Sequence, residues 1–284
     1  MKKNILLITV VVLLNSCQNY GQLKIVADLS KNLKEVSGNE FLKSTNSIWM
    51  INDGGNKSKL YEVSKKKGKI KRVIDIDAKN KDWEDITSDD EGNIYIGDFG
   101  NNDNDRKNLR ILKIKKKDLD EKKADIKTIK FEYENQQEFP PKKDQLFFDA
   151  EAFFYFNKNF YIFTKSRVDD QYGKTFLYRV PASTKGKHKA KLIGSFDNCS
   201  QNDCWFTAAD ISNNKKKVAL LSQKNIIIFS DFQGDNFFSG KVEKIKLKYK
   251  SQKEGICFKN NKTLYITDEK DGGDGCNLYE LKVD

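Results

Sequence analysis

One short motif recurs along this chain of 284 residues, and a similar series of apolar strands follows it each time. The strands alternate apolar and polar residues and are separated by Gly, Asn and Asp turns, a period typical of β-structure. Self-similarity at a regular spacing indicates repeated units of supersecondary structure. We therefore predict an all-β fold built from repeats. The motif occurs as EVSGNEF from Glu35, DWEDITS from Asp82, DAEAFFY from Asp149, TAADISN from Thr207 and QKEGICF from Gln252.

Each repeat predicts a sheet of four strands. The last repeat lacks its fourth strand, and the run QLKIVADL (22–29) can supply it, which is how a propeller ring closes. We predict a single β-propeller domain over residues 22–284, with five four-stranded blades and a ring closed by the N-terminal strand. Six blades are possible if the long second repeat contains a degenerate one. A β-sandwich or paired barrels would explain the strands but not their common register.

The N-terminal segment MKKNILLITVVVLLNSC has the features of a secretory signal. Two lysines precede an apolar run that is too short to span a membrane. The four residues LNSC at positions 14–17 resemble the lipobox of bacterial lipoproteins. We predict a signal peptide over residues 1–16, lipidation at Cys17 and a tether over residues 17–21; an ordinary cleaved signal with an incidental cysteine is the alternative. The lipid would anchor the protein to a membrane of the bacterial cell envelope. We expect the periplasmic side rather than the cell surface, because no acidic run follows Cys17.

The net charge of +11 comes from lysines in turn-like runs, such as KKKGKIKR (65–72). A nucleic-acid binder would concentrate this charge on one face, so we expect solvated outer strands and no nucleic-acid partner. Cys199 and Cys204 are close enough in CSQNDC to form a disulfide in an oxidising compartment. Cys257 and Cys276 could pair or stay as buried thiols.

In a propeller, the loop that enters each first strand and the loop after each second strand open on one face. Polar residues from all repeats would therefore meet at one mouth of the central channel. The best predicted metal ligands there are Glu84, Glu151, Glu254, Asp98 and Asn101. The predicted ligand-binding rim consists of Asp53, Asp82, Asp85, Asn102, Arg106, Asp149, Lys165, Arg167, Asp210, Lys224, Asp268 and Lys270. In this alignment, Ala209 takes the position at which three other repeats have a glutamate.

Several carboxylates in a narrow channel would repel one another unless they bind protons, cationic side chains or a metal. Ca²⁺ is the predicted cofactor because it takes about 6–8 oxygen ligands, for which carboxylates, amides and backbone carbonyls are suitable. Two alternatives stay open: an ion network with Lys165, Arg167, Lys224 and Lys270, or a wet mouth without metal. Trp83 could be a stacking platform or a wedge between blades.

The sequence lacks the residues and motifs of several common catalytic systems. The single histidine, His188, lies in a lysine-rich turn, so a Ser-His-Asp or Cys-His system is not expected. No GxSxG, HExxH or P-loop motif occurs. The remaining reaction class is metal-assisted hydrolysis of an ester, lactone or phosphoester.

The segment NDGGN…LYEV…DWEDITSDDEGNIYIGDFGNN…R, from Asn52 to Arg106, resembles a group of secreted bacterial propellers. It is also similar to a wider calcium-dependent set, which includes phytase-like and esterase-like propellers, gluconolactonase-type lactonases and the SdiA-regulated family. The resemblance implies a calcium ion at the channel mouth. The chain departs from these families at Ala209 and in lacking the histidines of lactonase-type sites.

Two functions follow from this sequence. The first is a lipid-anchored, monomeric envelope propeller whose calcium-binding mouth recognises a small anionic molecule, a glycan or an envelope protein. The alternative is a calcium-dependent hydrolase of a phosphoester, ester or lactone that uses the same mouth. Fold alone does not decide between them.

Overall fold

The computed structural model describes residues 20–283, so the predicted signal peptide and Cys17 lie outside the described residues. Within the described range the chain is built from β-strands and short 3-10 turns. The turns are η1 (Lys31–Leu33), η2 (Lys116–Asp120), η3 (Lys143–Gln145), η4 (Asn202–Cys204) and η5 (Phe237–Ser239). This part of the chain contains no helix with the length and apolarity needed to cross a bilayer.

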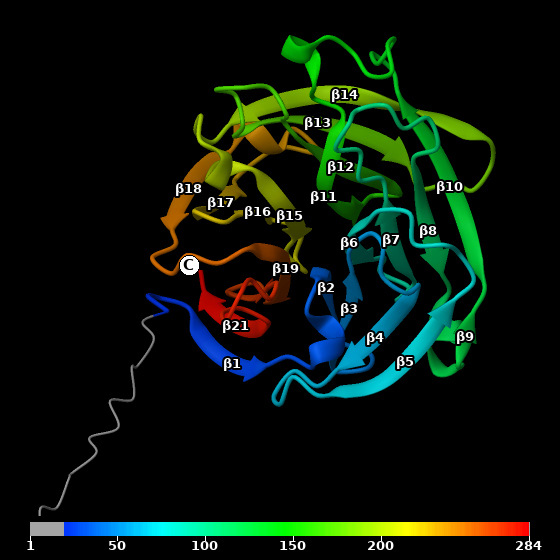
Figure 1. The fold of residues 1–284 in the computed structure, drawn as a ribbon, viewed down its shortest axis with the longest axis vertical. Helices are drawn as coiled ribbons and strands as arrows, with labels where there is room; N and C mark the ends of the chain where they lie inside the picture. The colour runs from blue at the N-terminus through cyan, green and yellow to red at the C-terminus, as the bar shows by residue number, and fades with distance from the viewer. Residues whose placement is uncertain (1–19, 284) are drawn as a thin grey trace, which may run out of the picture.

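The strands form antiparallel units of four, arranged around a central channel (Figure 1). The first unit contains β2 (Val36–Leu42), β3 (Ser47–Asn52), β4 (Lys59–Val63) and β5 (Ile70–Ile76). The second contains β6 (Trp83–Ser88), β7 (Ile94–Asp98), β8 (Arg110–Ile114) and β10 (Ile126–Tyr133). The third contains β11 (Asp149–Phe156), β12 (Asn159–Lys165), β13 (Lys174–Pro181) and β14 (Lys187–Asp197). The fourth contains β15 (Phe206–Ile211), β16 (Lys217–Ser222), β17 (Asn225–Ser230) and β18 (Lys241–Lys246).

The last unit closes the ring with the two ends of the described chain. It contains β19 (Lys253–Asn260), β20 (Thr263–Asp268) and β21 (Asn277–Lys282), and its outer strand is β1 (Lys24–Asp28), which pairs antiparallel with β21. The inner strands β2, β6, β11, β15 and β19 contact one another in a closed circle. The β-propeller and its closure by the N-terminal strand, both expected from the sequence, are confirmed.

Two outer pairings were not expected. Residues Lys130–Tyr133 of β10 pair in parallel with Lys187–Ala190 of β14, which joins the second and third units into one eight-stranded sheet. The two-residue strand β9 (Lys123–Ala124) pairs in parallel with β5. Both pairings supply partners to strand edges that would otherwise be open. The extra residues of the long second repeat thus form η2, β9 and η3 and a loop in the described structure, and not a further sheet.

An apolar cluster fills each space between neighbouring units. The cluster between the first and second units includes Trp49, Ile86 and Trp83, and the indole of Trp83 is fully buried there. Trp83 therefore lies as a wedge between units and not as an exposed stacking platform. Equivalent clusters lie at the other four junctions. At the junction between the last and first units, Leu278 packs with Val36. Burial of these faces drives the units to stack into a ring.

Candidate functional site

A β-bulge near the start of every inner strand shapes one mouth of the channel. The pairing register between first and second strands shifts at the same place in each unit. A bulge adds an unpaired residue and re-aims its side chain. The residues at the bulges are Ser37, Glu84, Glu151, Thr207 and Glu254.

The bulges correct the alignment of the fourth repeat, in which Thr207 and not Ala209 is equivalent to the glutamates. The Thr207 hydroxyl donates to Lys253 O at 2.6 Å, and the Ser37 hydroxyl donates to Trp83 O at 2.9 Å. These two hydroxyls join neighbouring inner strands. The bulged acids of the mouth are therefore the three glutamates that the sequence selected as metal ligands.

Three carboxylates form a tight group on one side of this mouth. Asp53, Asp82 and Glu84 each place a carboxylate oxygen so that all three atoms lie within 4.8 Å of one another. Asp53 comes from the turn after β3, whereas Asp82 and Glu84 flank the start of β6. We call these three residues the acidic triad. From the sequence, all three residues were expected at the mouth, but only Glu84 was predicted to be a metal ligand.

Two glycines allow this close approach. A Cβ atom on Gly100 would lie 2.0 Å from Glu84 Oε1 and 2.5 Å from Asp82 Oδ2. A Cβ atom on Gly54 would lie 2.4 Å from Asp82 Oδ1. In the turns NDGGN and GDFGNN, the backbone of Gly54 and Gly100 therefore lies directly against the carboxylates.

The acidic triad carries little compensating positive charge. Within residues 20–283, Asp53 and Glu84 have no ion pair, and Asp82 has only Arg106 at 3.9 Å. Burial, with the charge of Asp53, raises the pKa of Asp82 to about 6, and burial raises the pKa of Asp53 to about 6. Burial and then Glu151 raise the pKa of Glu84 well above its ordinary value. A bound cation would relieve both the burial cost and the repulsion.

An ion network lies next to the acidic triad, on the neighbouring third unit. Lys165 Nζ bonds Glu151, and Arg167 lies 3.5 Å from Glu151 Oε1 and 2.6 Å from Asp149 Oδ2. The Trp205 ring packs under both cations, with Lys165 Nζ at 4.9 Å and the Arg167 guanidinium carbon at 5.1 Å from its centroid. Of the four basic residues in the alternative ion network, Lys165 and Arg167 thus lie with the acids at this mouth, whereas Lys224 and Lys270 do not.

Glu254 and Glu269 complete the mouth. Gln252 donates to Glu269 Oε2 at 2.8 Å and also bonds Glu254. Burial, with the charge of Asp53, raises the pKa of Glu269 to about 8. From the sequence, Asp268 and not its neighbour Glu269 was predicted to lie on the rim. Glu269 takes the same place after β20 as Asp53 takes after β3, so an alignment of second-strand ends could have found it.

Two predicted ligands have other partners. The Asp98 carboxylate is fully buried between Arg106 at 3.0 Å and Arg110 at 2.7 Å. The Asn101 side chain accepts from Arg106 N at 2.8 Å and donates to Phe148 O at 2.9 Å. Both residues hold the turn behind the acidic triad, and Asp98 also accepts the N–H of Asp82. Asn102, at the exposed tip of this turn, accepts a bond from Arg167.

Four of the predicted rim residues lie away from the mouth. Asp85 is inside the channel, Asp210 lies at the far end of β15, and Lys270 is exposed in another surface hollow. Asp268 is fully buried and accepts from Tyr279 at 2.8 Å and Asn277 N at 2.9 Å. Periodicity places these residues near strand ends but does not give the side on which each side chain points.

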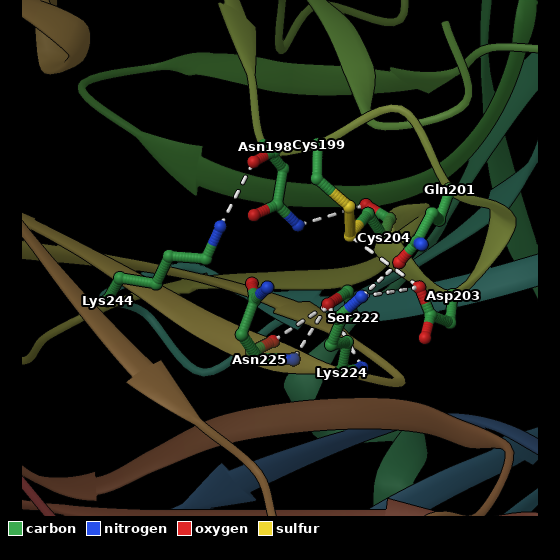
Figure 2. The surroundings of a disulfide bond; sticks show 9 residues. All are labelled: Asn198, Cys199, Gln201, Asp203, Cys204, Ser222, Lys224, Asn225 and Lys244. Atoms are coloured by element: carbon green, nitrogen blue, oxygen red, sulfur yellow. Dashed lines mark hydrogen bonds and ion pairs between the residues drawn. A yellow bond between two sulfur atoms is a disulfide. The ribbon is translucent and has the colours of Figure 1, made fainter. Parts of the chain in front are cut away.

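Lys224 bonds a neighbouring loop, and Figure 2 shows it beside Gln201 and Asp203 of that loop. Its Nζ lies 3.4 Å from Asp203 and also bonds Gln201. The same loop is closed by the disulfide between Cys199 and Cys204, the pair proposed from the sequence. This loop leads directly into Trp205. Cys257 and Cys276 are free buried thiols.

The raised pKa values predict an unusual pH dependence. In calcium-free buffer we expect stability to fall as the pH rises from about 4 to about 8. The pKa values of Asp53 and Glu269, about 6 and about 8, lie above those of an unfolded chain. The folded protein therefore binds more protons in this interval and loses stability as they leave. The melting temperature at about pH 5 and about pH 8 checks this. Asp53→Asn should reduce the difference, while Asp75→Asn, on an exposed part of β5, should not.

Together the fold and the site define a β-propeller with an acidic channel mouth. No family model matches the chain, and no curated protein matches its sequence. Solved structures do match. A gluconolactonase from Xanthomonas campestris has a TM-score of 0.54 at 10% identity, covering 92% of this chain and 89% of that one. A second structure, assigned provisionally as a gluconolactonase, has a TM-score of 0.51 at 9% identity, covering 90% and 76%.

At these identities the likeness shows the fold alone. It supports the propeller resemblance that the sequence indicated. Membership of the SdiA-regulated or phytase-like families is not shown.

Proposed function

We propose that the acidic mouth binds a divalent cation, with Ca²⁺ as the best fit, and uses it to hold an anionic envelope ligand. The observation that carries the proposal is the acidic triad: three carboxylate oxygens within 4.8 Å, against bare glycine backbone, with one distant arginine. An all-oxygen set suits a hard cation. The only histidine, His188, lies on the outer strand β14, bonds Ser183 O and is not in this set.

The acidic triad would supply the direct ligands. Glu151, whose charge acts on Glu84, and Glu254, which is close to Glu151, are candidates for completing the set. Asp98 and Asn101 would act behind it, because Asp98 accepts the Asp82 N–H at 3.3 Å and both residues fix the turn that carries Gly100. Partners of this kind orient metal ligands and tune them.

The ligand is expected to be anionic and to have an apolar face. Lys165 and Arg167 would attract its charge, and Trp205 would contact the apolar face. The two cations belong to the unit next to the acidic triad, and both are partly exposed. A ligand could thus meet a cation held by carboxylates on one side and basic side chains on the other. With the predicted lipid on Cys17, such a ligand would be a small molecule, glycan or protein of the cell envelope. We propose that the chain acts there as a monomer.

A calcium-dependent hydrolase is the second candidate, and the fold likeness to a gluconolactonase supports it at a coarse level. When bound, calcium would polarise a carbonyl or phosphoryl oxygen. Lys165 would orient the anionic substrate. Glu269, which is partly buried near Asp53, is the candidate for proton transfer.

Calorimetric titration of Ca²⁺ into the wild type, Glu84→Gln and Glu243→Gln tests the proposal. We expect millimolar or tighter binding by the wild type, about tenfold weaker or more for Glu84→Gln, and no change for Glu243→Gln, which removes the same charge from the exposed strand β18. Absence of wild-type binding at millimolar Ca²⁺ would overturn the metal site. Lactone, ester and aryl phosphate substrates then separate the two functions: calcium-dependent turnover that Glu84→Gln removes favours the hydrolase, and binding without turnover favours the ligand-binding protein.

A further inference from the structure

The channel has a second opening, where the inner strands end. These strands run in the same direction, because equivalent residues bond across units: Tyr155 N to Thr87 Oγ1, and Phe258 N to Asp210 Oδ2. The acidic mouth lies at their starts, so their last residues gather at the opposite end. A cavity of about 350 Å³ lies there. Its lining includes Glu40, Ser88, Tyr155, Asp210, Lys215 and Phe258.

Two buried carboxylates, Glu40 and Asp210, line this cavity, and neither is ion-paired with a described residue. Glu40 is 9% exposed and Asp210 is 8% exposed. Ser88 is the hydrogen-bond partner of Glu40, while Asp210 accepts the backbone N–H groups of Ile211 at 2.7 Å and Phe258 at 2.6 Å. Neither carboxylate forms a salt bridge with any lysine or arginine of the described chain. Lys215 faces the cavity and its charge partly opposes the effect of burial on both carboxylates, but its ion pair is with Asp90, at 3.3 Å.

The electrostatics of the two carboxylates favour a cation from outside. Burial, together with Asp210, raises the pKa of Glu40 well above its ordinary value, and burial raises the pKa of Asp210 to about 6. A buried carboxylate must be protonated or must have a positive partner. Because this pair opens on a cavity, the positive partner can be a ligand.

The lining points to an organic cation rather than a metal ion. Among the described residues, no group of three or more metal-ligating side chains converges at this opening, in contrast to the acidic triad. Instead, aromatic residues from three inner strands, Phe41, Tyr155 and Phe258, share the walls. Aromatic faces and carboxylates together bind ammonium and guanidinium groups, which are bulky and partly apolar.

We propose that the second opening binds an alkylammonium or guanidinium group through Glu40 and Asp210. The group can belong to a free amine or to a lysine or arginine side chain of a peptide. This site is separate from the acidic mouth and does not depend on calcium, so its titrations are made in a chelator.

The test is calorimetric titration of the full chain with n-butylamine, 1,5-diaminopentane and a blocked Gly-Lys-Gly peptide, with butanol as the uncharged control ligand. We expect the amines to bind and butanol not to bind. Glu40→Gln keeps an oxygen acceptor for Ser88 and should weaken amine binding about fivefold or more. Lys215→Gln removes a competing cation and should strengthen it. Glu243→Gln should have no effect.

Each outcome has a defined meaning. Tighter binding of the peptide than of the amines identifies a protein side chain as the ligand, and tighter binding of the diamine identifies a small molecule. Circular dichroism shows whether Glu40→Gln is folded; if it is not, the increase expected for Lys215→Gln remains an independent test. The proposal is wrong if no amine binds, or if a folded Glu40→Gln binds amines as the wild type does.

Discussion

Replacing Asp85 by alanine is expected to lower the free energy of unfolding by about 3–6 kcal/mol. The fully buried Asp85 carboxylate accepts the backbone N–H groups of Ile86 at 2.8 Å, Phe153 at 3.1 Å and Ala209 at 3.3 Å. One side chain thus joins the inner strands of three units across the channel. Alanine would leave these three N–H groups buried without an acceptor, at a cost of about 1–2 kcal/mol each.

Urea unfolding measures this loss, and two variants act as controls. Asp85→Asn keeps one acceptor oxygen and should lose less than Asp85→Ala. Asp75→Ala removes a carboxylate that is 64% exposed on β5, and its effect should stay within about 0.5 kcal/mol. A loss below about 1 kcal/mol for Asp85→Ala would show that the three bonds do not hold the channel together.

Replacing Gly100 by alanine is expected to weaken calcium binding about tenfold or more. The new methyl group would occupy the space of the Glu84 and Asp82 carboxylates, which lie 2.0 Å and 2.5 Å from its position. Both side chains would have to move apart, and calcium requires several oxygens at about 2.3–2.6 Å. This substitution changes no charge, so it tests the geometry of the acidic triad and not its electrostatics.

Gly273→Ala is the matched control for this experiment. A Cβ atom at Gly273 would have no heavy atom within 4 Å, so calcium affinity should be unchanged. Calcium titrations of both variants, with melting temperatures in chelator, separate a local effect from unfolding. Equal calcium affinity of Gly100→Ala and the wild type would mean that the cation binds elsewhere or not at all.

Strand periodicity was sufficient to predict the fold because every unit repeats one hydrophobic pattern. It was not sufficient for the site, because a bulge inserts one residue that periodicity cannot detect. Glu84 and Asp85 are adjacent in sequence, yet Glu84 belongs to the mouth while Asp85 bonds strands inside the channel. In the fourth repeat no glutamate marks the bulge, and the sequence alignment put Ala209 where Thr207 belongs.

Long-range partners account for the remaining differences. Asp53 directly follows β3 and Asp98 is the last residue of β7. Asp98 meets Arg106 and Arg110, whereas Asp53 forms no ion pair in the described structure. The residues around each aspartate in the sequence do not reveal this difference in partners. The pairing of β10 with β14 likewise depends on how neighbouring units pack, and sequence alternation does not encode it.

The joining of β1 to β21 sets the order in which this molecule can be completed during synthesis. Strand β1 precedes every other described strand along the chain but is the outer strand of the last unit, so it has no partner until β21 has been made. Throughout that time it presents an unpaired edge, which other chains could occupy. In the finished protein, one antiparallel ladder holds the two ends of the ring together. Local opening of that ladder would detach β1 from β21 in the last unit, while every other unit kept its own four strands.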